Sequence, residues 1–376
     1  MDDEGFRRAA RTWLSANVDP GLRGLGGPGR EHEAFPERLA FNRRLAAAGW
    51  TCLGWPVEHG GQGATLAREV VFHEEYARAQ APARVDHIGE TLVGPTLLAF
   101  GTPAQRQRFL PAIRTVEHLW CQGYSEPEAG SDLAAVATRA RLSGDRWLVT
   151  GQKVWTSLAH VADWCFMLVR TGQSGRAGLT HLLVPMRQPG ITVRPIRQLT
   201  GTAEFNEVFF DDAETEAGLV VGEVGQGWRV AMATLGFERG ASTVSQQIGF
   251  ERELADLVAL ARDTGAARDP VLRDRLARAF VDLTVLRAHT SRVLRDGSTP
   301  GDASAVKLMW SGWHQRLGEL AMDVLGPAGM VMTGGGDRWQ RLFLFSRADT
   351  IYGGTNEIQR TIIAERVLGL PRQARP

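Results

Sequence analysis

The sequence has few cysteines, no long apolar run and no excess of charge of one sign. Its three cysteines, Cys52, Cys121 and Cys165, are far apart and none begins a Cys-x-x-Cys pair. This argues against a disulfide framework, and we predict no metal site. No run of about 18 apolar residues is present, so we predict no membrane insertion. Residues 1–4 are acidic where a signal peptide is basic, and we expect a cytoplasmic protein.

The charge balance excludes further classes of partner. The chain has 43 Lys and Arg residues against 42 Asp and Glu residues, a formal net charge of +1. It therefore gives no reason to expect nucleic acid or an anionic membrane as the main partner. With 376 residues, 43% of them hydrophobic, the sequence predicts a globular protein of two or three domains.

The apolar spacing of the first part of the chain is helical. Residues 6–14 place Phe, Ala, Trp and Leu on one stripe, and we expect further helices over about 35–50, 66–80 and 91–100. These elements predict an N-terminal helical domain over residues 1–118.

The pattern then changes to that of strands. Short apolar runs bounded by Gly and Pro follow one another without helices between them, at residues 146–150, 165–169, 181–185 and 207–210. Such spacing predicts a middle antiparallel β-barrel or β-sandwich domain over residues 119–226.

Helical spacing returns for the rest of the chain. Amphipathic segments cover roughly 228–264, 269–296 and 302–326, and a last helix begins near Asn356. Four helices with short connections predict a four-helix bundle over residues 227–376. The fold class is therefore α+β, in the order helical, β, helical.

Two segments of the middle domain carry groups suited to a planar cofactor. Residues 124–132 supply hydroxyls and backbone N–H groups on a loop bent by Gly and Pro. Residues 155–157, Trp-Thr-Ser, place an indole beside two small hydroxyls, and an indole can cover one face of a flat ring. On chemistry alone, a turn followed by a core tryptophan explains these residues equally well.

Two C-terminal segments also carry functional groups. Glu238 and Arg239 are an adjacent acid and base between two glycines, and an inward-facing Glu238 would be a costly buried carboxylate. The simpler interpretation is a solvent-facing pair at a helix start. In residues 350–360, a Gly-Gly step enters a helix and exposes backbone N–H groups to a ligand, although it could also be an ordinary capped helix start.

Taken together, these motifs resemble those of the acyl-CoA dehydrogenase family. The resemblance runs from about residue 6 to residue 372, in the order expected for that family, and includes the segments 55–63, 101–111, 124–132, 155–157, 204–210 and 351–360. Several motifs in a consistent order are specific, whereas each alone is not. The family's helical, β, helical architecture agrees with the periodicity.

The resemblance implies an FAD cofactor and an acyl-CoA thioester substrate. Cofactor-binding residues implied in this way are Gln122, Tyr124, Ser125, Trp155, Ser157, Asp323, Gly326, Thr355 and Glu357. Trp155 would stack on the flavin ring, Ser157 would lie at its N5 edge, and Ser131 would contact the CoA part of the substrate. The residues Tyr352 and Gly353, with Arg239, would complete the substrate site.

The position of the catalytic base departs from the commonest family pattern. Many members have a glutamate directly after the Tyr of the Ile-Tyr-x-Gly-Thr motif, where this chain has Gly353. One branch carries the base on a bundle helix just before an arginine, and Glu238 with Arg239 fits that pattern. The resemblance thus implies dehydrogenation of the thioester to the trans-2-enoyl-CoA, with Glu238 accepting the α proton. The alternative is a non-catalytic subunit.

Further departures concern the assembly. The family's Arg-x-x-Phe-Gly segment, which reaches the neighbouring subunit's FAD, is missing from residues 261–270, and Asp323 replaces a glutamine. The resemblance implies a homodimer or homotetramer, or a heterotetramer with a related chain, and an electron-transferring flavoprotein as electron acceptor.

Other functions on this scaffold stay open from the sequence. A flavin oxidase or monooxygenase is one alternative, although such relatives usually lack the glutamate base. Small residues Gly89, Gly94 and Ala99 on one helix suggest a wide cavity for a branched or bulky acyl group. The sequence does not distinguish CoA from an acyl carrier protein as the carrier.

Overall fold

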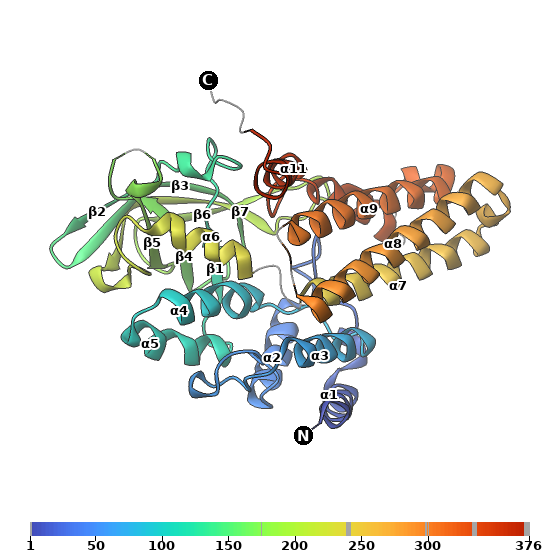
Figure 1. The fold of residues 1–376 in the computed structure, drawn as a ribbon, viewed down its shortest axis with the longest axis horizontal. Helices are drawn as coiled ribbons and strands as arrows, with labels where there is room; N and C mark the ends of the chain where they lie inside the picture. Colours follow the sequence, from blue (N-terminus) through green and yellow to red (C-terminus); the bar gives the residue numbers. More distant parts are fainter. Residues whose placement is uncertain are drawn as a thin grey trace. The chain divides into compact units, whose positions relative to one another are not determined.

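The structure, a computed structural model, describes residues 2–173, 175–237, 242–297, 299, 301–332 and 337–371, and for residues 242–245 only the backbone. Glu238 and Arg239 lie outside the described residues. The chain falls into two compact units (Figure 1). The first comprises Met1–Glu69 and Arg78–Gly240, the second Val70–Ala77 and Ala241–Pro376. The predicted domain boundaries at 118 and 226 remain predictions.

The helices predicted for the start of the chain are confirmed. They are α1 (Asp3–Asn17), α2 (Phe35–Ala47), α3 (Leu66–Arg78) and α4 (Gly94–Phe100), with a π-helical turn over Gly89–Val93 before α4. A further helix that was not predicted, α5 (Pro103–Arg114), follows. The start of α5 is a capping box, in which the Thr102 side chain accepts from the Gln105 N–H and the Gln105 side chain accepts from the Thr102 N–H.

The expectation that Gly89 and Gly94 widen a substrate cavity is wrong. A Cβ atom built on Gly94 would lie 1.8 Å from Cζ2 of Trp55, and one on Gly89 would lie 3.1 Å from Cδ1 of Trp120. Both glycines therefore let indole rings pack closely against the helix, and the space that a side chain would fill is already occupied.

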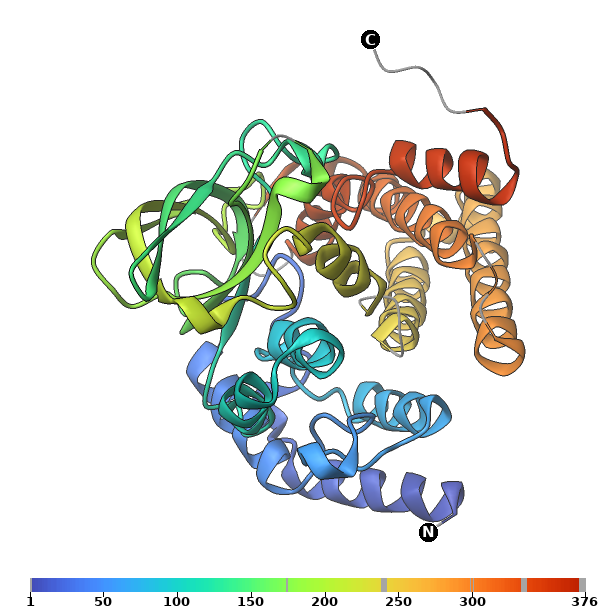
Figure 2. The same ribbon diagram turned by 60° about the vertical axis from the view of Figure 1, so that its left-hand side comes forward.

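The middle of the chain forms one seven-stranded sheet that curls on itself (Figure 2). Its strands are β1 (Trp120–Gly123), β2 (Arg139–Ser143), β3 (Arg146–Ser157), β4 (Trp164–Arg170), β5 (Leu179–Pro185), β6 (Ile191–Ile196) and β7 (Phe205–Glu216). The order is β1-β4-β2-β3-β7-β6, with β5 paired to β4. The predicted β domain is confirmed, but β4 pairs in parallel with β1 and with one residue of β2.

The continuous apolar run of β4 is explained by burial on both faces. Trp164, Phe166 and Leu168 enter one core together with side chains of α4, α5 and α6 (Gly227–Phe237). The alternating residues Cys165 and Met167 enter a second core inside the curled sheet. The first core holds β1 against the helices and thereby fixes the strand end that leads into residues 124–132, the first predicted cofactor segment.

The second unit is helical. It contains α7 (Ser242–Asp263), α8 (Pro270–Asp296), α9 (Asp302–Leu325), α10 (Arg338–Phe345) and α11 (Asn356–Ile362), with a π-helical turn over Ile363–Val367. Residues Phe250, Leu286, Trp313 and Leu317 belong to its core. Two details differ from prediction. The helix expected over 228–264 is described as α6 and α7, which belong to different units. The short helix α10 was not predicted, although its eight residues are amphipathic. Among the described residues, no helix is long and apolar enough to span a membrane.

Candidate flavin and substrate site

An exposed indole marks the predicted flavin site in the first unit. The pairing of β3 with β7 shifts register between Lys153 and Thr156, and Trp155 lies in this bulge with a φ of 59°. A left-handed backbone is unfavourable for a bulky residue and is a common feature of functional sites. The Trp155 side chain is 56% exposed, and its ring meets Phe205 edge-on at 6.1 Å. The bulge thus turns a flat aromatic face outward, as a stacking residue requires.

The two predicted flavin segments meet in the fold. The backbone N–H of Val154 donates to the carbonyl oxygen of Ser125 at 2.9 Å. Ser157 ends β3 opposite Phe205, and both Ser125 and Ser157 are half-buried. The structure therefore brings the loop after β1 beside the strand that carries Trp155 and Ser157.

Unpartnered polar atoms in this region fit a heterocyclic cofactor. The Gln122 Nε2 and the Thr156 Oγ1 are both buried and have no hydrogen-bond partner among the residues described. Because a buried donor without an acceptor costs about 1–3 kcal/mol, such atoms indicate a missing ligand group. An amide donor, small hydroxyls and an open indole are the groups that would hold an isoalloxazine ring, so the residues present fit FAD.

This assignment predicts opposite effects on the apoprotein and on cofactor binding. Gln122→Leu removes the unpartnered donor, so the apoprotein should be as stable as the wild type or more stable by about 1 kcal/mol. FAD binding should weaken by roughly fivefold, since one hydrogen bond is lost. Thermal unfolding of the apoprotein and fluorescence titration with FAD measure the two effects. Thr156→Val is the matched variant, and an unchanged FAD affinity in both would contradict the assignment.

A buried ion pair holds the loop after β1 against β3. The Lys153 Nζ lies 2.7 Å from the Glu126 Oε1 and also donates to the carbonyl oxygens of Tyr124 and Leu168, at 3.2 Å and 2.7 Å. Glu126 in turn accepts from the backbone N–H groups of Ala137 and Thr138. Burial lowers the Lys153 pKa, and although burial opposes it, the adjacent ammonium group holds the Glu126 pKa below its usual value.

Tyr124 and His181 complete this support. The Tyr124 side chain is 6% exposed, stacks on Phe166, and has its hydroxyl 3.2 Å from the His181 Nε2. The Tyr124 hydroxyl is thus paired inside the protein. Burial, with a smaller contribution from the Lys153 charge, lowers the His181 pKa from 6.5 to about 3.

The depressed pKa of His181 predicts a loss of stability in acid. Between pH 6.5 and pH 3 the unfolded chain binds a proton at His181 that the folded chain does not, so stability falls as the pH falls. The contribution is about 1.4 kcal/mol per pH unit in that window. His181→Gln should lose this part of the slope. Hydrogen exchange of the β4 and β5 amides, compared between wild type and variant at pH 4, 5, 6 and 7, measures it; parallel curves would contradict the prediction.

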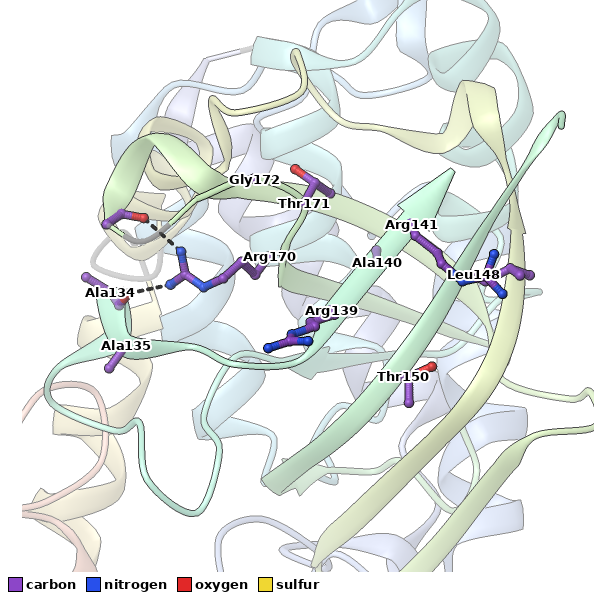
Figure 3. A pocket seen from close by; sticks show the side chains of 11 residues that line it. Ala134, Ala135, Arg139, Ala140, Arg141, Leu148, Thr150, Arg170, Thr171 and Gly172 are labelled. Atoms are coloured by element: carbon purple, nitrogen blue, oxygen red, sulfur yellow. Dashed lines mark hydrogen bonds between the residues drawn. The ribbon is translucent and has the colours of Figure 1, made fainter. Parts of the chain in front are cut away.

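Ser131, the predicted CoA contact, is exposed and lies three residues before Ala134, the first residue that lines an open groove. The groove holds about 820 Å³ and is lined by Ala134, Ala135, Arg139, Ala140, Arg141, Leu148, Thr150, Arg170, Thr171, Gly172 and Gly175 (Figure 3). The Arg170 guanidinium is committed to backbone carbonyls, including that of Ala134 at 2.8 Å. Arg139 and Arg141 are exposed on the same face of β2 and supply positive charge for an anion.

In the second unit, the Gly-Gly turn precedes a capped helix as predicted. Gly353 and Gly354 have φ values of 64° and 85°, which only glycine adopts without strain. Thr355 is the N-cap of α11, with its side chain accepting from the Ile358 N–H at 3.2 Å. Glu357 is exposed in the first turn, and hydrogen bonding there lowers its pKa. The Thr355 hydroxyl is therefore already used by the helix.

Asp323 and Gly326, the other predicted cofactor residues, line one cavity of about 530 Å³ with Gly329 and Gln340. The Asp323 carboxylate is 2.6 Å from the Arg275 Nη1. The buried Gln340 Oε1 has no hydrogen-bond partner among the described residues. The structure thus brings the two predicted residues together, but the Asp323 carboxylate is paired with an exposed arginine of the same chain.

Three residues of this region were not predicted from the sequence: Lys153, its partner Glu126, and His181. One signal was present: Lys153 is one of only two lysines in the chain. The roles predicted for Glu238 and Arg239 cannot be placed in the fold, since both lie outside the described residues.

Comparison with known proteins agrees with this geometry. Models of the N-terminal, middle and C-terminal domains of acyl-CoA dehydrogenases match residues 1–117, 121–213 and 225–368. The chain is 63% identical to the acyl-CoA dehydrogenase IpdE1 of Mycobacterium tuberculosis and 60% identical to that of Mycolicibacterium smegmatis, in each case over 100% of both chains.

Solved structures show the same fold. The steroid acyl-CoA dehydrogenase Tcur3481-Tcur3483 matches with a TM-score of 0.86 and 29% identity, covering 99% of this chain and 100% of that one. The ChsE4-ChsE5 complex from Mycobacterium tuberculosis matches with a TM-score of 0.84 and 30% identity, covering 99% and 98%. The chain therefore belongs to the acyl-CoA dehydrogenase family and is an FAD-dependent oxidoreductase.

Proposed function

We propose that this enzyme removes two hydrogens from a bulky acyl-CoA thioester, of the kind derived from a steroid, to give the trans-2-enoyl-CoA. The observation that carries the reaction is the outward-facing Trp155 beside the unpartnered Gln122 and Thr156, a site for a flavin ring. The likeness to the steroid acyl-CoA dehydrogenase supports the large size of the substrate. Gly89 and Gly94 do not support it, because indole rings fill the space beside them.

In this proposal, the chain's own residues position the thioester and accept its proton. A backbone N–H of the Gly353–Gly354 turn donates to the carbonyl oxygen and stabilises the enolate as it develops. Glu238 accepts the proton from the α carbon, and Arg239 orients the carboxylate. Bound FAD supplies the acceptor for the β hydrogen and its electron pair. An electron-transferring flavoprotein is the acceptor that we expect to reoxidise the enzyme.

The test is an anaerobic titration of the yellow holoenzyme with a panel of acyl-CoA thioesters, followed by mass spectrometry. Bleaching with a loss of two mass units from a fused-ring or branched thioester supports the proposal. In a parallel assay under air, rapid consumption of oxygen with formation of peroxide or of a hydroxylated product would instead support an oxidase or monooxygenase.

The arginine groove supports CoA as the carrier, because its phosphates need cationic partners. Arg139→Ala and Arg141→Ala should each raise KM for a CoA thioester about 3- to 10-fold, as expected for exposed charge-assisted contacts. KM for the corresponding pantetheine thioester, which lacks the nucleotide, should not change. Arg187→Ala is the control, since that side chain is 78% exposed and pairs with Asp163 outside the groove. An equal increase in KM for both thioesters would contradict the assignment.

We also propose that the chain works in a heteromer with a related chain. The support is the Asp323–Arg275 ion pair at a predicted cofactor cavity, together with the likeness to Tcur3481-Tcur3483 and to the ChsE4-ChsE5 complex, each of which is named for two chains. Flavin content per chain, measured after expression alone and after expression with a related chain, tests this. Full FAD occupancy of the chain by itself would contradict it.

A further inference from the structure

We propose that Glu253, His314 and Asp349 form a charged array that positions Tyr352 and the Gly353–Gly354 turn for catalysis. The array lies within the second unit and contains none of the residues that the reaction above uses. The inference rests on the proposed function in one respect: the turn is taken to bind the thioester carbonyl. His314 is then a positioning residue, acting on the substrate only through the turn.

His314, on α9, lies between two carboxylates. Its Nδ1 is 2.6 Å from the Asp349 Oδ2, and its Nε2 is 3.2 Å from the Glu253 Oε2. Because a carboxylate only accepts hydrogen bonds, both ring nitrogens must carry a proton, and the ring is an imidazolium. Phe250 packs at 4.8 Å from the ring, and the His314 side chain is 13% exposed.

Asp349 connects this cation to the turn. Its side chain is 1% exposed, and its second carboxylate oxygen accepts from the Tyr352 hydroxyl at 2.7 Å. The backbone carbonyl of Asp349 accepts from the Lys307 Nζ, which also lies 4.9 Å from the centre of the Tyr352 ring. The carboxylates of Glu253 and Asp349 thus balance the charges of His314 and Lys307. Both carboxylate oxygens and the carbonyl oxygen of Asp349 accept a hydrogen bond.

The turn is fixed from its other side by Gln359. The Gln359 Nε2 donates to the carbonyl oxygens of both Gly353 and Gly354, at 3.2 Å each. In a trans peptide the N–H points opposite to the carbonyl, so the N–H groups of Gly354 and Thr355 point away from Gln359. The exposed turn is therefore held from within by Gln359 and, through Tyr352, by the array.

The charges around His314 make its protonation a testable part of the array. Burial opposes the charge, but the hydrogen bonds that His314 donates to Asp349 and Glu253 raise the His314 pKa to about 10. Glu253 faces the ring from α7, Asp349 faces it from the segment after α10, and Lys307 and Tyr352 act through Asp349. Arg347 is directed to the Gln315 carbonyl and to Glu319.

The test compares His314→Gln and Glu253→Gln with a matched control. His289→Gln is the control, since His289 on α8 also lies near a carboxylate, 3.4 Å from Asp302, in the same unit. The probe is acetoacetyl-CoA, whose enolate absorbance reports stabilisation of the oxyanion without electron transfer. His314→Gln should lower the bound enolate fraction and slow flavin reduction about 10- to 100-fold, with FAD content unchanged and acetoacetyl-CoA affinity reduced only by the share that the enolate contributes. His289→Gln should change none of these.

The pH profile separates positioning from a purely structural role. Glu253→Gln removes one of the two carboxylates, so the rate should match the wild type near pH 6 and fall between pH 7 and pH 9, where the wild type stays flat. A His314→Gln variant that behaves like His289→Gln, a flat profile for Glu253→Gln, or no enolate on the wild type would each overturn the proposal. If the enolate depends on His314 but no thioester bleaches the flavin, the array stands and the proposed dehydrogenation fails.

Discussion

Glu238→Gln should reduce the rate of flavin reduction by an acyl-CoA about 10²- to 10⁴-fold, since an amide cannot accept the α proton and a positioned general base contributes this much. FAD content and thioester affinity should stay unchanged, because the amide keeps the size of the side chain. Anaerobic stopped-flow absorbance of the flavin measures the rate. Glu223→Gln, at an exposed glutamate before α6, is the control and should keep the full rate. Full activity of Glu238→Gln would refute the assignment of the base.

A rescue variant sharpens this prediction. Gly353 stands where many relatives have the base, and a Cβ atom built there would lie 3.9 Å from Cε of Lys307, so there is room for a side chain. Its φ of 64° makes a non-glycine residue cost roughly 1–2 kcal/mol. Glu238→Gln combined with Gly353→Glu should therefore recover part of the lost rate. No recovery in a folded, flavin-loaded double variant would show that the loop position no longer reaches the α carbon.

The fold was predictable because its signals are periodic. Alternate residues of β4 enter two different cores, and the apolar faces of α8 and α9 meet in a third. The spacing of apolar residues alone therefore predicts that these segments are a strand and two helices. The parallel pairing of β1 with β4 was not predictable, because strand order depends on contacts between segments some 40 residues apart. The error over Gly89 and Gly94 has the same origin: the sequence shows a missing side chain, but not the Trp55 and Trp120 rings that fill its place.

Residues of the candidate site were predictable where they form local motifs. The Trp155 bulge and the Gly353–Gly354 turn are contiguous segments with their own backbone signature. The array of Glu253, His314 and Asp349 was not, since its three members come from separate elements and no spacing joins them. Charged residues that act through one another become visible only when the fold brings them into contact.

The buried pair of Lys153 and Glu126 should give the largest effect on stability. Lys153→Met leaves the Glu126 carboxylate buried without its cation, and it also removes donors from the Tyr124 and Leu168 carbonyls. Breaking a buried pair in this way costs about 3–5 kcal/mol, whereas replacing both charges is often close to neutral. We expect Lys153→Met to destabilise the first unit by that amount and to release FAD.

The double variant Lys153→Met with Glu126→Gln distinguishes the charge from the loop contacts. Its glutamine can still accept from one of the Ala137 and Thr138 N–H groups that Glu126 binds, and no unpaired charge stays buried. Stability, measured by urea unfolding of the apoprotein, should recover by more than half. FAD affinity should recover less, because the Tyr124 carbonyl still lacks the Lys153 donor and the loop has lost this contact with β3, although the Val154–Ser125 hydrogen bond stays. Equal recovery of both would mean that the pair serves stability alone; no recovery of stability would mean that the carbonyl contacts, and not the charge balance, hold the strand in place.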